Sequence, residues 1–158
     1  MLMPGDIRIR LMDAADIDAV MAIAASLATA PHWPRTAYET TLAPFATPRR
    51  IALVGESAGD VIGFAIASLV PPHAELETIA ISHSHQRHRL GSALLEAMLR
   101  RLESLETAEI MLEMRASNLA AQAFYRAHSF NAVARRNGYY ADGEDAVLMR
   151  AILFRAQK

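Results

Sequence analysis

A short basic segment ahead of an apolar helical pattern is the first part of the chain whose residue types suggest chemistry. It reads Gln86-Arg87-His88-Arg89-Leu90-Gly91-Ser92-Ala93 and joins a predicted strand to a predicted helix. A helix N-terminus exposes unpaired backbone N–H groups and the positive end of the helix dipole, so phosphate binds there readily. Arg87 and Arg89 add positive charge that suits phosphate. The segment therefore predicts a phosphate-binding loop, although a basic first turn on a surface helix explains the same residues.

Three histidines, His83, His85 and His88, lie close together around this loop and raise the question of a metal site. No carboxylate is near them in the sequence, and they lie where phosphate is expected to bind. The chain has no cysteine, which removes disulfides, thiolate metal sites and cysteine nucleophiles. We therefore expect solvated loop histidines and no metal.

Length and composition suit one domain, residues 1–158. Of these residues 53% are hydrophobic and 21% are charged, which is ordinary for a soluble protein. The formal net charge of −1 and the scattered arginine pairs provide no basic surface for nucleic acid. There is no signal-peptide pattern and no apolar run of the roughly 20 residues that span a bilayer. We expect a cytoplasmic protein that binds neither nucleic acid nor a membrane.

Hydrophobic periodicity predicts the elements that must position the loop. Alternating apolar residues and β-branched runs indicate strands, and apolar residues at helical spacing indicate helices. The expected strands are 7–11, 50–56, 61–70, 75–82, 108–114, 130–135 and 146–154. The expected helices follow Asp13, cover about 35–42 and 90–105, and follow Asn118. This order predicts a mixed α/β domain with helices packed on a largely antiparallel sheet.

Several sequence blocks, most of them in the C-terminal half, recur in the same order in one known enzyme family. They read I-A-I (79–81), L-E-M-R-A-S-N (112–118), A-F-Y-R-A-H-S-F (123–130), R-R-N-G-Y-Y (135–140) and E-D-A-V-L-M (144–149). These blocks resemble the RimI-type N-acetyltransferases of the GNAT superfamily. The resemblance runs from about Glu75 to Leu153, roughly half the chain. In the N-terminal half, only the hairpin and the region of His32 and Trp33 look similar, and more loosely.

The resemblance implies a GNAT acyl-CoA N-acyltransferase fold, with acetyl-CoA as co-substrate and direct acetyl transfer to a protein N-terminal α-amine. Such an amine is largely protonated at pH 7 and must lose a proton before it attacks a thioester. Matching positions make Glu113 the general base, Tyr125 the general acid for the leaving thiolate, and the Ile81 backbone N–H the oxyanion donor. The implied cofactor-binding residues are Ile79, Ala80, Ile81, Arg87, His88, Arg89, Leu90, Gly91, Ser92 and Asn118.

Two departures from the family pattern stand out. Arg89 replaces the first glycine of the family's loop, which reads Q/R-x-x-G-x-G/A, and His128-Ser129 stands where the family usually has Leu-Gly. An arginine at this place keeps its backbone N–H available if its backbone is helical and its side chain points outward. The substitution bears on coenzyme affinity rather than on the fold.

Each candidate also has a purely structural interpretation. Glu113 alternates with apolar residues, as on a solvated strand face; Tyr125 adjoins an apolar helical stripe, as a core tyrosine would; Asn118 suits a helix cap. Tyr139-Tyr140 with Asp142, Glu144 and Asp145 fits either a patch for a basic peptide or an exposed turn, since Asp-Gly is a turn signal. His32 and Trp33 fit either the acceptor cleft or a packing anchor.

We therefore expect a protein Nα-acetyltransferase, and the resemblance implies the N-terminal alanine of a small-subunit ribosomal protein as its acceptor. One alternative is a GNAT enzyme for a small amine such as a polyamine, an aminoglycoside or an amino acid. A second is a GNAT-fold module that binds acyl-CoA without catalysis; Arg89 favours it, and the retention of Glu113 and Tyr125 opposes it. The acyl-chain preference and the oligomeric state stay open.

Overall fold

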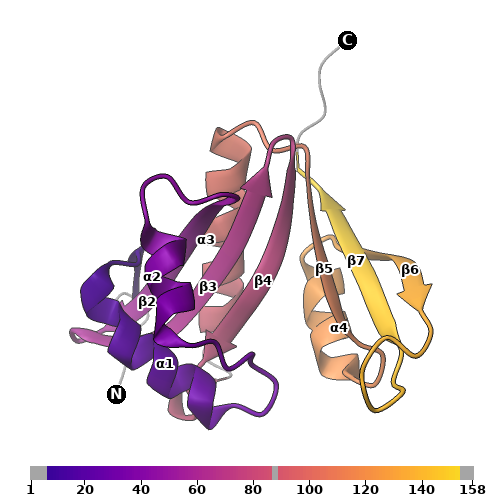
Figure 1. The fold of residues 1–158 in the computed structure, drawn as a ribbon, viewed down its shortest axis with the longest axis horizontal. Coiled ribbons are helices and arrows are strands. Elements are labelled where there is room, and N and C mark those ends of the chain that lie inside the picture. The colour runs from indigo at the N-terminus through magenta and orange to yellow at the C-terminus, as the bar shows by residue number, and fades with distance from the viewer. Residues whose placement is uncertain (1–6, 87–88, 154–158) are drawn as a thin grey trace.

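The computed structural model describes residues 7–86 and 89–153, and the expected site residues Arg87 and His88 lie outside this range. Figure 1 shows one sheet with helices on both of its faces. The strands are β1 (Ile7–Leu11), β2 (Arg49–Ser57), β3 (Asp60–Val70), β4 (His73–Ile81), β5 (Glu109–Arg115), β6 (Asn131–Arg136) and β7 (Ala146–Ile152). The α-helices are α1 (Ile17–Ser26), α2 (Arg35–Leu42), α3 (Leu90–Ser104) and α4 (Leu119–Ala127), with short 3-10 turns at Ala14–Asp16 and His83–His85.

The sheet has seven strands in the order β1-β2-β3-β4-β5-β7-β6. All neighbouring strands pair antiparallel except β4 and β5, which are parallel and are connected through α3. One apolar cluster lies between the sheet and α3 with α4, and a second joins α1, α2 and the opposite face of β2 and β3. The predicted mixed α/β class with a largely antiparallel sheet is confirmed.

Helix α3 shows how the sequence pattern produces this packing. Its buried side chains recur at helical spacing and form a single apolar face. They are Leu90, Leu94, Leu95, Met98 and Leu102. The opposite face carries charged residues, so the helix covers the sheet with one side and meets solvent with the other.

Strands β4 and β5 are paired only where they begin. Residues 73–75 pair with residues 109–111, and beyond Glu75 the two strands diverge, as Figure 1 shows. Strand β4 also carries a bulge: Ala67 pairs with Leu76 and Ile66 with Thr78, so Glu77 has no partner on β3. The divergence leaves the backbone groups of β4 that face β5 without a strand partner.

The expected element boundaries hold to within a few residues. Strand β4 begins at His73, two residues before the predicted start, and β7 ends at Ile152. Phe130 was expected to begin a strand, but it precedes β6 and is fully buried in the core. Among the described residues, no helix is both long enough and apolar enough to cross a membrane.

Candidate active site

A cavity of about 860 Å³ lies at the divergence of β4 and β5. Its walls come from β4, β5, the first turn of α3, helix α4 and the segment that follows α1. Nine of the catalytic and cofactor-binding residues expected from the sequence line it: Ile79, Ala80, Ile81, Arg89, Gly91, Ser92, Glu113, Asn118 and Tyr125. Leu90 does not, because its side chain is 1% exposed and packs in the core.

The backbone of β4 presents hydrogen-bonding groups to this cavity. The Ser82 N–H donates to the Ile62 carbonyl across 2.9 Å, so the polar groups of Ser82 face β3. Successive residues of a strand alternate in direction, so the N–H and C=O of Ile81 face the opposite, open side. The Gln86 side-chain amide donates to the Ile81 carbonyl across 3.1 Å, which agrees with this direction. The Ile81 N–H is thus directed into the space between the diverging strands.

The first turn of α3 begins at Arg89 in a left-handed conformation, with φ of 61° and ψ of 10°. The Arg89 backbone is therefore not helical, so the condition under which an arginine here would keep its N–H available is not met. Left-handed backbone favours glycine, because a Cβ atom there crowds the following carbonyl. This conformation explains why the family's loop carries glycine at this place. Gly91 and Ser92 in the first turn of α3 line the cavity, and the first N–H groups of a helix have no partner within it.

Tyr125 lies on α4, and its side chain forms part of both the core and the cavity wall. The residue is 8% exposed and packs edge-on against Phe124 and Phe130, with ring centroids 5.1 and 5.4 Å away. Burial raises the pKa of its hydroxyl to about 12. At neutral pH Tyr125 is therefore a protonated hydroxyl that can donate into the cavity.

Asn118 positions this helix. Its side-chain oxygen accepts a hydrogen bond from the Ala121 N–H across 3.1 Å and caps α4. The same residue lines the cavity. Capping and cofactor contact are thus compatible, and the cap alone explains the residue type.

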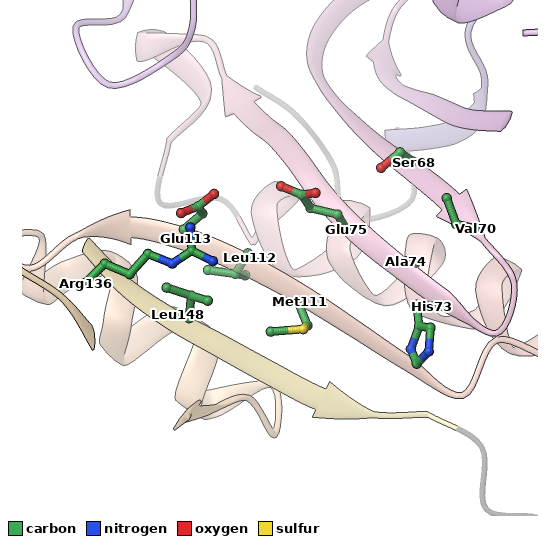
Figure 2. Close-up of a pocket in the computed structure, with 10 residues that line it drawn as sticks. All are labelled: Ser68, Val70, His73, Ala74, Glu75, Met111, Leu112, Glu113, Arg136 and Leu148. Atoms are coloured by element: carbon green, nitrogen blue, oxygen red, sulfur yellow. The ribbon is translucent and has the colours of Figure 1, made fainter. Parts of the chain in front are cut away.

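Glu113 projects from β5 into the opening between the strands. Its side chain is exposed, and Figure 2 shows its carboxylate and that of Glu75 extending into the space above β4 and β5. Both residues border the pocket of about 300 Å³ drawn in Figure 2, which continues along the sheet toward Val70 and His73. The Tyr139 hydroxyl donates to Glu113 Oε1 across 3.3 Å.

Glu75 was not singled out in the sequence. Partial burial raises the pKa of its carboxyl, and the nearby charges of Glu113 and Glu77 raise it further. Two carboxylates facing one opening favour a cationic group between them, such as a protonated amine. The alternation of Glu75 and Glu77 with apolar residues placed them on one strand face, but the nearness of Glu113 depends on the pairing of β4 with β5.

A second pocket, of about 410 Å³, adjoins Glu113 on the same face. Its lining includes Trp33, Tyr139 and Tyr140, together with the ion pair in which Arg50 Nε lies 3.1 Å from Glu77 Oε1. Trp33 also packs against Tyr38 with ring centroids 5.5 Å apart, so it is both a packing anchor and a pocket residue. His32 does not line this pocket; its Nε2 lies 3.3 Å from the Leu27 carbonyl.

The acidic residues after Tyr140 are engaged by arginines of β5 and β6 and by backbone N–H groups. Arg115 Nη1 donates to Asp142 across 2.8 Å and to Glu144 across 2.9 Å. Asp145 accepts from Arg135 Nε across 2.8 Å and from the Gly138 N–H across 2.9 Å. Because these carboxylates already have partners, the structure favours the turn interpretation over a free acidic patch. Within residues 7–86 and 89–153, no three His, Asp or Glu side chains come together as metal ligands.

Comparisons with known proteins show which proteins this chain resembles. The model of the acetyltransferase (GNAT) family matches residues 17–130. The [ribosomal protein bS18]-alanine N-acetyltransferase of Escherichia coli K12 is 44% identical over 94 residues, which cover 58% of this chain and 64% of that protein. The chain thus spans just under two thirds of the length of that relative.

Two further comparisons cover nearly the whole chain. A putative [ribosomal protein bS18]-alanine N-acetyltransferase of Bacillus subtilis is 31% identical over 142 residues, covering 89% of this chain and 92% of that protein. The crystal structure of the ribosomal-protein-S18-alanine N-acetyltransferase from Escherichia coli superimposes with a TM-score of 0.85 at 32% identity. That superposition covers 96% of this chain and 97% of the other.

Proposed function

Because this chain belongs to the acetyltransferase (GNAT) family, we propose that it moves the acetyl group of acetyl-CoA directly to the N-terminal α-amine of a protein. The observation that carries the proposal is that Glu113 and Tyr125, from different elements, line one cavity with the Ile81 backbone. A carboxylate, a protonated hydroxyl and a free N–H are the groups that this transfer requires.

The cavity fits the coenzyme in size and chemistry. Its volume suits a ligand of that size, and the N-terminal turn of α3 supplies N–H groups and a positive dipole end for phosphates. Arg89, Gly91 and Ser92 line that end, and Asn118 lines the α4 side. When bound, acetyl-CoA supplies the activated acetyl thioester. Ile79, Ala80 and Ile81 would flank it along β4.

The three groups have separate tasks in the proposed reaction. Glu113 takes a proton from the acceptor amine, directly or through water, so that the nitrogen lone pair can attack the thioester carbonyl carbon. The Ile81 N–H donates to the carbonyl oxygen as negative charge develops there. Tyr125 donates its hydroxyl proton to the departing sulfur as the C–S bond breaks. The proton that the attacking nitrogen still carries is lost to water, and Tyr125 regains its proton from water. The acetyl group passes to the amine without a covalent enzyme intermediate.

The acceptor is proposed to be the N-terminal alanine of a small-subunit ribosomal protein, which would place the enzyme in the cytoplasm. The name of the Escherichia coli relative supports this choice, as does the pocket of Trp33, Tyr139 and Tyr140 beside Glu113. Aromatic side chains of this kind can enclose an extended peptide backbone. The carboxylates of Glu75 and Glu113 suit the positive charge of the incoming amine.

Calorimetric titration with acetyl-CoA, followed by a thiol-release assay against peptides and small amines, tests the proposal. We expect micromolar binding, together with thiol release that is fastest on peptides beginning with alanine. If thiol is released only with polyamines or aminoglycosides, the acceptor is a small amine and not a protein N-terminus. Binding without release on any amine would indicate a module that binds acyl-CoA, and absence of binding would overturn the enzyme assignment.

A further inference from the structure

His128 connects two elements of the cofactor cavity. It stands immediately after α4, and its Nε2 lies 3.0 Å from the hydroxyl oxygen of Ser92 in the first turn of α3. Ser92 lines the cavity, whereas His128 does not. The side chain of His128 is 12% exposed. A buried side chain of one element is therefore bonded to a cavity-lining hydroxyl of another.

The surroundings of the imidazole fix its orientation. The ring of Phe124 lies 5.0 Å from the His128 ring, and the carboxylate of Glu96 lies 4.0 Å from Nδ1, on the opposite side from Ser92. Phe124 also covers Gly91, where an added Cβ would meet the aromatic ring at 3.6 Å. The contact between α4 and the start of α3 thus combines an apolar surface with one polar link.

We propose that His128 is a positioning residue for the coenzyme: it holds Ser92 so that the Ser92 hydroxyl donates to a phosphate group of the bound nucleotide. A hydroxyl has one hydrogen and two lone pairs. When Ser92 Oγ accepts from His128 Nε2–H, its own hydrogen is free for a ligand in the cavity. Hydrogen bonds to charged acceptors are stronger than those to neutral ones.

This inference rests on the proposed function but adds a component that belongs to this chain. The related enzymes usually carry leucine at the position of His128, and leucine cannot donate to Ser92. Leucine would retain the apolar contact with Phe124 and lose only the polar link. By holding Ser92, His128 would fix the direction of a hydroxyl donor at the end of the cavity that Arg89 also lines.

A double-mutant cycle on the affinity for CoA tests the link. The cycle compares wild type, His128→Leu, Ser92→Ala and the double variant by calorimetry. We expect each single change to raise the Kd for CoA about five- to tenfold. The double change should be no worse than either single one, because both remove the same interaction. His128→Gln, whose amide can replace the Nε2 donor, should stay within about twofold of wild type.

Steady-state kinetics separate positioning from general structural damage. The KM for acetyl-CoA should rise in His128→Leu while kcat stays within about twofold, since the phosphates lie far from the reacting carbonyl. Ser104→Ala, the same change in the last turn of α3, serves as a control with unchanged Kd and KM.

The outcomes distinguish this inference from the proposed function. If wild type binds CoA and His128→Leu binds it equally well, or if the two single effects add in the double variant, the positioning role is overturned and the proposed function stands. If wild type does not bind CoA, both the positioning role of His128 and the proposed function are overturned.

Discussion

The Tyr139 hydroxyl lies 3.3 Å from Glu113 Oε1 and donates its hydrogen to that carboxylate. Glu113 belongs to β5, and Tyr139 to the connection between β6 and β7. The proposed base is therefore oriented by a residue that also lines the proposed acceptor pocket. The orientation of Glu113 and the shape of the acceptor pocket therefore both depend on the Tyr139 side chain.

Tyr139→Phe should lower kcat/KM for the peptide acceptor by about fivefold, because one neutral hydrogen bond to the base is lost while the ring remains. Thiol-release kinetics measure this effect. Tyr38→Phe is a matched control, since Tyr38 is a buried residue of α2 and does not line the cavity between β4 and β5. An unchanged kcat/KM in Tyr139→Phe would show that this bond has no part in orienting Glu113.

Glu113→Gln should lower kcat/KM by about 10²-fold or more, because the amide cannot accept the amine proton. The Kd for acetyl-CoA should change by less than about twofold, since the substitution keeps the side-chain shape. Glu75→Gln, on the other side of the opening, is the comparison. It should lower kcat/KM much less than Glu113→Gln, if Glu75 attracts the amine but does not take its proton. Equal losses in the two variants would contradict the assignment of the base to Glu113 alone.

Tyr125→Phe should lower kcat by about 10²-fold or more, because the leaving sulfur loses its proton donor. The pKa of about 12 keeps the wild-type hydroxyl protonated at least to pH 10, so ionisation of Tyr125 should not reduce the rate below that pH. A pH profile of kcat measures both points. A rate close to wild type in Tyr125→Phe would remove this residue from the mechanism.

The same residue should affect alkaline stability. The pKa of the Tyr125 hydroxyl is raised above the ordinary value of 10. Its contribution to the free energy of unfolding is therefore complete below pH 10 and is lost as the pH rises toward 12. Denaturant titrations between pH 9 and 11 should show wild type losing stability with pH more steeply than Tyr125→Phe. Equal slopes for the two proteins would contradict a raised Tyr125 pKa.

Local patterns predicted most of the fold because each element carries its own signal. The alternation in 7–11, the Asp13 cap and the apolar face of α3 all correspond to elements in the structure. The candidate site residues were chosen for a different reason: they lie in contiguous blocks that resemble one enzyme family. Their placement around one cavity depends on the parallel pairing of β4 with β5, which no local pattern contains.

Three further features of the structure could not be predicted from local sequence patterns, because each depends on how separate elements come together. The nearness of Glu75 to Glu113 comes from the pairing of Glu75 with Met111, which are separated by 35 residues of chain (76–110). The bond from His128 to Ser92 joins the end of α4 to the start of α3. The left-handed backbone of Arg89 is imposed by the approach to α3, and residue type alone predicts the opposite.

Arg89→Gly should stabilise the fold by about 1 kcal/mol, because relief of the left-handed strain exceeds the added entropy of the unfolded chain. For a domain of this size we expect the Tm to rise by about 2–4 °C. Thermal unfolding measures the shift. Arg101→Gly is the matched control: Arg101 lies inside α3, so the same change should destabilise by about 1 kcal/mol. A lower Tm in Arg89→Gly would mean that the Arg89 side chain stabilises the loop more than its backbone strains it.

The buried carboxylate of Asp16 should determine part of the acid stability. Asp16 accepts hydrogen bonds from Arg10 Nη1 and Nη2, each across 2.8 Å, and from the Asp13 N–H across 2.9 Å. Its side chain is 7% exposed. These donors, and Arg10 foremost, hold the pKa of Asp16 below its ordinary value of 3.8. The contribution of the ionised Asp16 carboxylate to the free energy of unfolding is therefore complete well above pH 3.8. It is lost as the pH falls through the lower pKa of the folded state.

Asp16→Asn should lower the free energy of unfolding at pH 7 by about 2–3 kcal/mol, because two charge-assisted bonds become neutral or are lost. The gap between wild type and variant should narrow steadily as the pH falls from about 5 toward 2, since the wild-type carboxyl then becomes protonated as well. Urea titrations at several pH values measure this convergence. Asp18→Asn is the control, because Asp18 is exposed and its pairing with Arg35 lies at the surface. A gap that stays constant with pH would show that Asp16 contributes through packing and not through its charge.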